Sequence, residues 1–157
     1  MLTVDSRNCF EYYHNMSSKS VQFSVAVHIM AALGYNQGKE IRSEMLASSI
    51  RADPSFVRRT LSKLAKAGLV VTARGRHGAC SLARAPKLIT LLEIYQASGA
   101  PTTFAIHDYP VEPACPTSVH IKPCLFGLLD RIQSRVEDTL MQITLADVVS
   151  DIREKIL

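Results

Sequence analysis

The chain has 157 residues, of which 47% are hydrophobic and 20% are charged, and its formal net charge is +4. This size and composition are typical of one soluble globular domain with a core of its own. No apolar run reaches the roughly 18 residues that a membrane span needs, and no basic stretch leads into an apolar one at the N-terminus, as a secretory signal requires. We therefore expect a cytoplasmic protein without membrane contact.

The first predicted helix follows an N-terminal extension at residues 1–16, which shows no clear periodicity. Apolar residues recur densely from about Ser20 to Leu33, and this density predicts a buried helix that ends near Gly34. The helix opens a predicted domain that spans residues 17–99.

Two short helices are predicted next, joined by a tight turn. Ser43 is expected to cap the first. The second has the stronger start signal, because Asp53 can act as its N-cap and Pro54 fits the first turn, where a missing N–H costs nothing. Gly68 is expected to end this helix. Its apolar face falls at helical spacing and comprises Val57, Leu61, Leu64 and Ala65. The pair of helices predicts a helix-turn-helix.

A hairpin is predicted directly after this pair. Residues 69–74 indicate a strand, residues 75–78 a turn and residues 79–82 the returning strand. A basic hairpin in this position is the wing of a winged helix. Thr90 and Glu93 then form a predicted capping box, which starts another short helix that Gly99 closes.

Basic residues are concentrated between Arg51 and Arg76, where seven Lys or Arg accompany a single acid, Asp53. This window carries +6, which leaves −2 for the rest of the chain. A local surplus of this kind indicates a polyanionic partner. The polar face of the helix at residues 54–67 carries no acid, whereas an ordinary solvated surface intersperses both signs. We therefore predict that this helix contacts duplex DNA.

The candidate DNA-binding residues are Ser55, Phe56, Arg58, Arg59, Lys63 and Lys66 in the helix, and Arg74, Arg76 and His77 in the wing. The first turns of such a helix enter the major groove, where either arginine can bind guanine bidentately. The two lysines are predicted to contact phosphates, and the cations of the wing to enter or flank a minor groove. The phenylalanine could pack against a sugar or a thymine methyl group, or equally against the core.

Residues 100–118 contain four prolines and little regular pattern, which is typical of a functional or mobile loop. We interpret this segment as a sensor loop. Residues 119–157 contain an apolar stripe over about five helical turns, and Thr144 can cap a last helix. The members of the stripe are Leu125, Leu128, Leu129, Ile132, Val136, Leu140 and Ile143.

Cys115 and Cys124 lie at the junction of this loop and the long helix. They could form a reversible disulfide, or one of them could be a reactive thiolate that senses an oxidant or an electrophile. Cys124 could instead be a small core residue. A metal site from His107, Cys115, His120 and Cys124 has suitable ligand types, but their spacing is not that of a known zinc pattern. Cys80, in the wing strand, is predicted to be structural, although it lies close enough to DNA to report on modification.

The motifs resemble the Rrf-type winged-helix regulators, which include the iron–sulfur cluster regulator, the nitric-oxide-sensing repressor and the cysteine-metabolism repressor. The resemblance rests on residues 67–70 (AGLV), 74–75 (RG), 82–84 (LAR), 89–91 (ITL) and 144–147 (TLAD). It covers roughly Met16 to Ile152. It implies a homodimer that pairs through its long C-terminal helix and binds a palindromic duplex operator.

Two features depart from the pattern of these regulators. The glycine-rich wing turn is partly replaced by residues 76–79 (RHGA). Cluster-binding members carry three closely spaced cysteines before the dimerisation helix, where this chain has only Cys115 and Cys124. The resemblance therefore implies the cluster-free, thiol-based branch, whose members share a Cys-Pro motif like Cys115-Pro116, without a cofactor or a metal.

We therefore predict a mainly α fold, namely a winged helix-turn-helix with a two-stranded wing and a long C-terminal dimerisation helix. The predicted function is that of a sequence-specific repressor whose operator affinity changes when an oxidant or electrophile modifies Cys115, Cys124 or Cys80. The alternatives are an iron–sulfur or other metal-dependent regulator of the same fold, and a winged helix used for protein–protein contact. An enzyme is not expected, because no glycine-rich phosphate loop, nucleophile elbow or suitably placed carboxylate pair is present.

Overall fold

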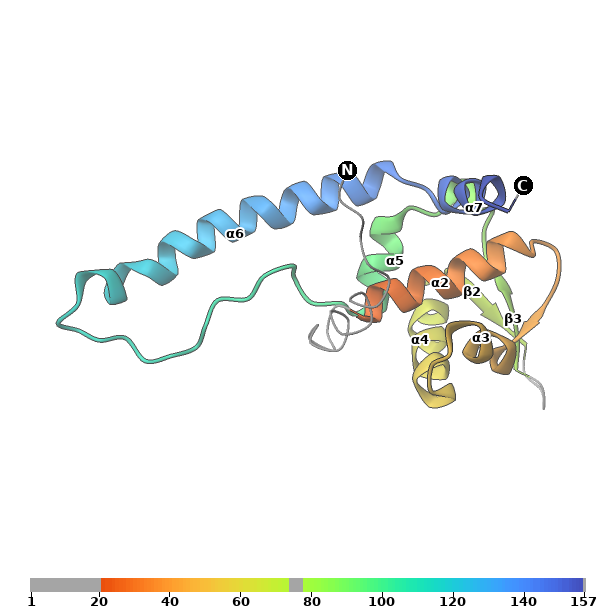
Figure 1. The fold of residues 1–157 in the computed structure, drawn as a ribbon, viewed down its shortest axis with the longest axis horizontal. Helices are drawn as coiled ribbons and strands as arrows, with labels where there is room; N and C mark the ends of the chain where they lie inside the picture. The colour runs from red at the N-terminus through yellow and green to blue at the C-terminus, as the bar shows by residue number, and fades with distance from the viewer. Residues whose placement is uncertain (1–20, 74–77, 157) are drawn as a thin grey trace, which may run out of the picture.

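The structure is a computed structural model that describes residues 21–73 and 78–156. The N-terminal extension predicted at residues 1–16 lies outside the described residues. In chain order the elements are α2 (Val21–Tyr35), β1 (Ile41–Arg42), α3 (Ser43–Ile50), α4 (Pro54–Lys66), β2 (Val70–Thr72), β3 (Ala79–Leu82), the 3-10 helix η1 (Pro86–Leu88), α5 (Leu91–Ser98), α6 (Pro116–Gln142) and α7 (Leu145–Glu154). The fold is mainly helical, with one small sheet and a long helix that projects from the body (Figure 1).

Helix α2 forms the centre of the core, as its dense apolar sequence predicts. Ile29 and Met30 are fully buried in it, among residues of α4, α5 and α7. The helix ends at Tyr35, one residue after Gly34, as predicted. A Cβ atom at Gly34 would lie 3.0 Å from Cγ2 of Val149, so this glycine lets α7 pack closely on α2. This close packing contact explains why the residue near the end of the helix is a glycine.

The helix-turn-helix is confirmed, with one error at its start. Ser43 is the first helical residue of α3, Arg42 precedes it as the N-cap, and no side chain caps this end. The start of α4 is as predicted, because Oδ1 of Asp53 accepts hydrogen bonds from the N–H groups of Ser55 (2.9 Å) and Phe56 (3.1 Å). Such a cap satisfies two of the backbone donors that a helix leaves unpaired at its start.

The sheet contains the two predicted wing strands and a third strand that the sequence did not reveal. β2 pairs antiparallel with β3, with Val71 opposite Ser81. β1 pairs with the other edge of β3, and Ile41 lies opposite Cys80. Two residues are too short for an alternating pattern to be visible in a sequence, so only the pairing in space identifies this strand.

Helices α5 and α7 begin side by side, and both begin with the predicted threonine cap. Thr90 forms a capping box with Glu93, and Thr144 forms one with Asp147. The two threonines also form an isolated antiparallel β-bridge. This arrangement fixes the end of α6 and the start of α7 to the body of the domain.

Helix α6 has 27 residues, none of which is buried. It begins at Pro116, three residues before the predicted domain boundary at residue 119, because the proline occupies the first turn. The preceding segment, residues 100–115, runs back along α6 (Figure 1). It is attached there by Nζ of Lys122, which donates to the carbonyl oxygen of Tyr109 (2.7 Å).

Within the described part of the chain, no helix is both long and apolar enough to cross a membrane.

Candidate nucleic-acid interface

Helix α4 separates its residues cleanly into a buried face and a solvent face. Val57, Leu61 and Leu64 are buried in the core. Apart from Pro54, the exposed residues of the helix are polar or cationic, and none is a carboxylate: Ser55, Arg58, Arg59, Ser62, Lys63 and Lys66. An uncompensated cationic face on a rigid helix is suited to a polyanion.

The N-terminal end of α4 is stabilised by the anionic side chain of its N-cap residue. The hydrogen bond from the Phe56 N–H is the main reason that the pKa of Asp53 lies below its ordinary value, and the carboxyl group is therefore an anion at neutral pH. The anion stabilises the positive end of the helix dipole. The two exposed arginines, Arg58 and Arg59, follow in the next turn, on the part of a recognition helix that reaches base edges.

A groove of about 680 Å³ lies between α4, the start of α3 and the strands of the wing. Arg58, Ser62 and Lys66 line it from α4, and Thr72 and Gly78 line it from the wing. The structure thus brings the helix and the wing to a common concave surface. Glu44, at the start of α3, also lines the groove and is an acid that the sequence did not place there.

Two of the predicted contact residues have partners within the protein. The ammonium group of Lys63 donates to the carbonyl oxygen of Ser98, at 2.9 Å. The ring of Phe56 is partly buried and packs against the core, which supports the core alternative for this residue. Arg74, Arg76 and His77 lie outside the described residues, so their predicted contact with a minor groove stays a prediction.

Arg51 is a candidate DNA contact that the sequence did not identify. It is the C-cap of α3, in the turn before α4, and its backbone is left-handed at φ 55°, ψ 38°. It is the only described non-glycine residue with a positive φ. Glycine adopts this conformation without the steric cost that an arginine incurs, and Arg51 is exposed. Residues held in an unfavourable backbone conformation are often functional. We therefore consider the exposed guanidinium of Arg51, in the turn before α4, a candidate contact to DNA.

Replacing Arg51 by glycine is expected to leave the stability of the protein unchanged or to raise it, because glycine relieves the left-handed backbone. The same change is expected to weaken duplex binding and to lower the slope of log K against log salt by about 0.9 for each phosphate that is no longer neutralised. Thermal unfolding and fluorescence anisotropy measure the two effects. Unchanged duplex affinity in Arg51→Gly would show that the guanidinium does not touch DNA.

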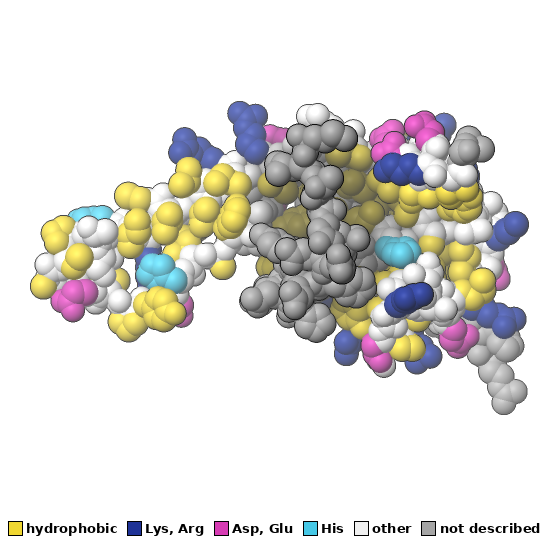
Figure 2. All heavy atoms as spheres, viewed as in Figure 1, with side chains coloured by type: hydrophobic (Ala, Val, Ile, Leu, Met, Phe, Trp, Pro, Cys, Tyr) yellow, Lys and Arg dark blue, Asp and Glu magenta, His cyan; other side chains and the backbone are white. Residues whose placement is uncertain are grey.

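A second candidate surface lies on α6. Leu128, Ile132 and Val136 line a shallow, mostly apolar groove of about 550 Å³ on this helix, and Arg131 and Arg135 flank it. Leu128 is 45% exposed and Phe126, two residues earlier, is 68% exposed. Hydrophobic side chains are visible along much of this arm (Figure 2). An apolar stripe of this length on one helix is typical of a surface that another helix covers.

The cysteines differ in accessibility. Cys80 is 2% exposed, and its thiol donates to the carbonyl oxygen of Gly78 at 3.3 Å. Burial, followed by the charge of Glu40, raises the pKa of the Cys80 thiol, so its reactive thiolate is disfavoured. These observations favour the structural role for Cys80 over the sensor role. Cys115 and Cys124 are exposed free thiols, so Cys124 does not belong to the core of a single chain.

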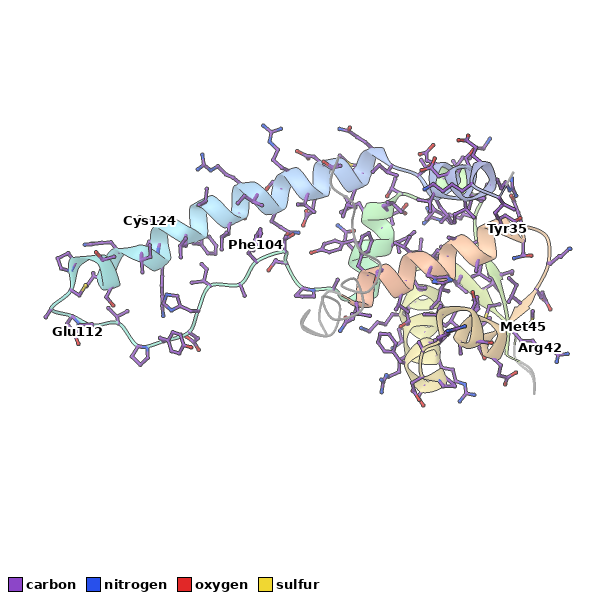
Figure 3. All side chains as sticks on the ribbon, in the orientation of Figure 1. Tyr35, Arg42, Met45, Phe104, Glu112 and Cys124 are labelled. Carbon is purple, nitrogen blue, oxygen red and sulfur yellow. The ribbon has the colours of Figure 1, made fainter. Side chains whose placement is uncertain are left out.

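Cys115 and Cys124 are not placed for a disulfide within one chain. Cys115 is the N-cap residue of α6 and Cys124 lies inside the helix (Figure 3). Nine residues of helix correspond to about two and a half turns and a rise of about 13.5 Å, whereas a disulfide requires Cα atoms within about 7 Å. The rise along α6 therefore separates the two residues, and joining their thiols requires that the start of the helix unwinds.

The same geometry does not fit a metal centre. A cluster needs several thiolates that converge on one point, whereas these two are separated by about two and a half turns of helix. Among residues 21–73 and 78–156, no group of three or more His, Cys, Asp or Glu side chains is arranged to hold a metal ion.

Comparison with known proteins gives a consistent result. A model of the Rrf2 family, described as "Iron-dependent Transcriptional regulator", matches residues 19–151. The HTH-type transcriptional regulator YwnA of Bacillus subtilis (strain 168) is 33% identical over 130 residues, which are 82% of this chain and 95% of YwnA.

Several solved structures are similar to this chain. A transcriptional regulator from Lactobacillus plantarum is similar with a TM-score of 0.72 and 26% identity, over 85% of this chain and 90% of that one. CymR of B. subtilis, titled the global cysteine regulator, is similar in fold, with a TM-score of 0.59 and 22% identity over 96% and 98% of the two chains. The family and these relatives are transcriptional regulators and not enzymes. The chain belongs to the Rrf2 family of DNA-binding transcriptional regulators.

Proposed function

We propose that this regulator is a homodimeric repressor that binds a palindromic duplex operator and releases it when a thiol on α6 is modified. The observation that supports the proposal most strongly is the pairing of two different surfaces on one chain. One is the acid-free cationic face of α4, and the other is the apolar stripe of α6. A two-fold dimer formed through the second surface presents two copies of the first.

The contacts on DNA follow from the position of each residue. Arg58 and Arg59, near the start of α4, are proposed to bind base edges in the major groove, with Ser55 beside them. Lys66 lines the groove towards the wing and is proposed to contact phosphate, as Arg51 is. The wing cations predicted from the sequence, Arg74, Arg76 and His77, are proposed for the adjacent minor groove. Glu44 in the groove would oppose phosphate or accept a hydrogen bond from cytosine N4.

The occupant proposed for the apolar groove of α6 is the same helix of a second copy. No residue of α6 is buried within one chain, although the sequence places an apolar residue in nearly every turn. Pairing two such helices buries Leu128, Ile132 and Val136 of both copies, and each apolar square ångström removed from water contributes about 25 cal/mol. Arg131 and Arg135 at the edges of the groove keep contact with solvent.

The proposed sensor is a single exposed thiol. An oxidant such as hydrogen peroxide reacts with a thiolate so that an S–O bond forms, the O–O bond breaks and hydroxide leaves, which converts the thiolate into a sulfenic acid. Cys115 is suited to this role because it joins the loop to α6, where the N–H of Glu112 donates to Oγ of Ser118 at 2.8 Å. Pro123 inside α6 removes one helical hydrogen bond, so a modified thiol at either cysteine acts on a weakened stretch of helix.

The experiment begins with duplexes selected from a random pool, which define an operator for binding by fluorescence anisotropy. We expect tight binding that falls steeply with salt, and weaker binding after hydrogen peroxide. Cys115→Ser or Cys124→Ser is expected to abolish the effect of peroxide, whereas Cys80→Ser is not. Absence of duplex binding in both redox states would refute the proposal. Visible absorption bands after anaerobic purification would instead favour the iron–sulfur alternative.

A further inference from the structure

The ammonium group of Lys63 is held at the C-terminal end of α5. It donates to the carbonyl oxygen of Ser98 at 2.9 Å, and a Cβ atom at Gly99 would lie only 2.9 Å from the same nitrogen. Gly99 is the C-cap of α5 and is left-handed at φ 69°. A cation at this position satisfies a free carbonyl group and interacts favourably with the negative end of the helix dipole.

A third helix lies close to the same contact. Oε1 of Gln22, in the first turn of α2, is buried and has no hydrogen-bond partner among the described residues. It lies 3.9 Å from the point that a Cβ of Gly99 would occupy, the same point that lies beside the Lys63 nitrogen. An ammonium group carries three donors. Lys63 of α4 is therefore anchored at the C-terminal end of α5, near the start of α2.

From Ser98, hydrogen bonds continue to the long helix. Oγ of Ser98 donates to the carbonyl oxygen of Tyr95 at 2.7 Å. The hydroxyl of Tyr95 donates to the carbonyl oxygen of Pro101 at 2.6 Å and accepts from Nε2 of Gln133 on α6 at 3.2 Å. The ring of Tyr95 packs edge-on against Phe23 of α2, with centroids 5.5 Å apart.

The segment before α6 joins the same network. Oε1 of Gln133 accepts from the N–H of Thr103 at 2.9 Å and from its hydroxyl at 3.1 Å. Hydrogen bonds between successive residues, linked by the covalent structure of Ser98, Tyr95 and Gln133, thus lead from α4 through the end of α5 to α6 and to the segment at residues 100–115. We define Lys63, Ser98, Tyr95 and Gln133 as the α5 hub.

We propose that Lys63 is a positioning residue, and not a phosphate contact, which sets the orientation of the recognition helix relative to α6 through the α5 hub. The inference rests on the proposed function, in which α6 is the dimer helix. In a two-fold dimer, the angle between α4 and α6 determines whether both recognition helices reach their half-sites together. Lys66, three residues later on the same helix, lines the groove between α4 and the wing and provides the contrast.

The test compares Lys63→Met with Lys66→Met on two duplexes, the selected full operator and a duplex that carries one half-site. Methionine keeps most of the side-chain stem and removes the charge. For Lys63→Met we expect the affinity for the full operator to fall about tenfold, because the recognition helix of the second subunit then has a lower effective concentration at its half-site. The affinity for the half-site duplex and the salt slope are expected to stay unchanged. For Lys66→Met we expect weaker binding to both duplexes and a salt slope lower by about 0.9 for each phosphate that the lysine neutralises in the wild type.

A second variant tests the other end of the hub. Tyr95→Phe removes one hydroxyl group, and we expect it to reproduce the loss on the full operator alone. Because both changes break one network, the double variant Lys63→Met/Tyr95→Phe should lose less affinity than the sum of the two single losses. Thermal unfolding of each variant reports any loss of folded protein.

Each outcome has a distinct meaning. A reduced salt slope in Lys63→Met, or equal losses on the half-site and the full operator, would overturn the positioning role and leave the proposed function intact. Additive losses in the double variant would separate Lys63 from Tyr95 and would overturn the hub. Failure of the wild-type protein to bind any duplex would refute the proposed function itself.

Discussion

Replacing Arg58 and Arg59 together by alanine is expected to weaken operator binding by about a thousandfold or more. Each bidentate contact between arginine and guanine contributes about 1–3 kcal/mol, and a dimer would lose four arginines. Both side chains are exposed and belong to a helix whose core face is formed by Val57, Leu61 and Leu64. The unfolding temperature is therefore expected to change little. Fluorescence anisotropy with the selected operator measures the loss.

The matched control is Lys87→Ala together with Lys155→Ala, which removes the same charge from exposed positions on η1 and at the end of α7. The control is expected to bind the operator almost as the wild type does, because neither lysine lies on α3, α4 or the wing strands. Equal losses in the two double variants would mean that net charge, and not the face of α4, determines binding.

Replacing Ile132 by aspartate is expected to convert the dimer into a monomer and to reduce operator affinity by at least about a hundredfold. Ile132 lies in the apolar groove of α6 with Leu128 and Val136, and pairing two copies would bury two unpaired carboxylates, which is strongly unfavourable. In a monomer, each recognition helix must also bind its half-site in a separate bimolecular step. Linking two binding modules raises the overall affinity by about 10²–10⁴, and the monomer loses this gain. Sedimentation velocity measures the first effect and anisotropy the second.

Ser134→Asp is the control for this change. Ser134 is exposed and lies two residues further on, on the opposite side of the same helix. It introduces the same charge into α6, so it is expected to leave the dimer and the operator affinity intact. A dimer that persists in Ile132→Asp would place the contact between subunits elsewhere. A monomer in both variants would show that added charge on the helix, and not the apolar groove, is responsible.

The elements with local signals were predictable from the sequence. Asp53 and Pro54 predict the start of α4, and the threonine caps at Thr90 and Thr144 predict the starts of α5 and α7, as the structure confirms. These signals are local because a helix cap uses donors and acceptors within three residues of one another. The exposed face of α4, without a carboxylate, follows from the same helical spacing.

Features formed by contacts between distant residues were decided by the tertiary structure. β1 exists only because Ile41 meets Cys80, and Glu44 enters the groove only because α3 packs beside α4. In the sequence, Lys63 and Lys66 have the same charge on the same helix face, but only the fold places the carbonyl of Ser98 beside the first.

The cysteines show the same difference between what the sequence predicts and what the tertiary structure decides. A separation of nine residues left a disulfide between Cys115 and Cys124 open, and the position of the helix start then separated the two thiols. Spacing along a chain determines local hydrogen bonding and the faces of a helix. The partners that a charged or reactive side chain meets depend on which elements pack together, and that packing is a property of the whole core.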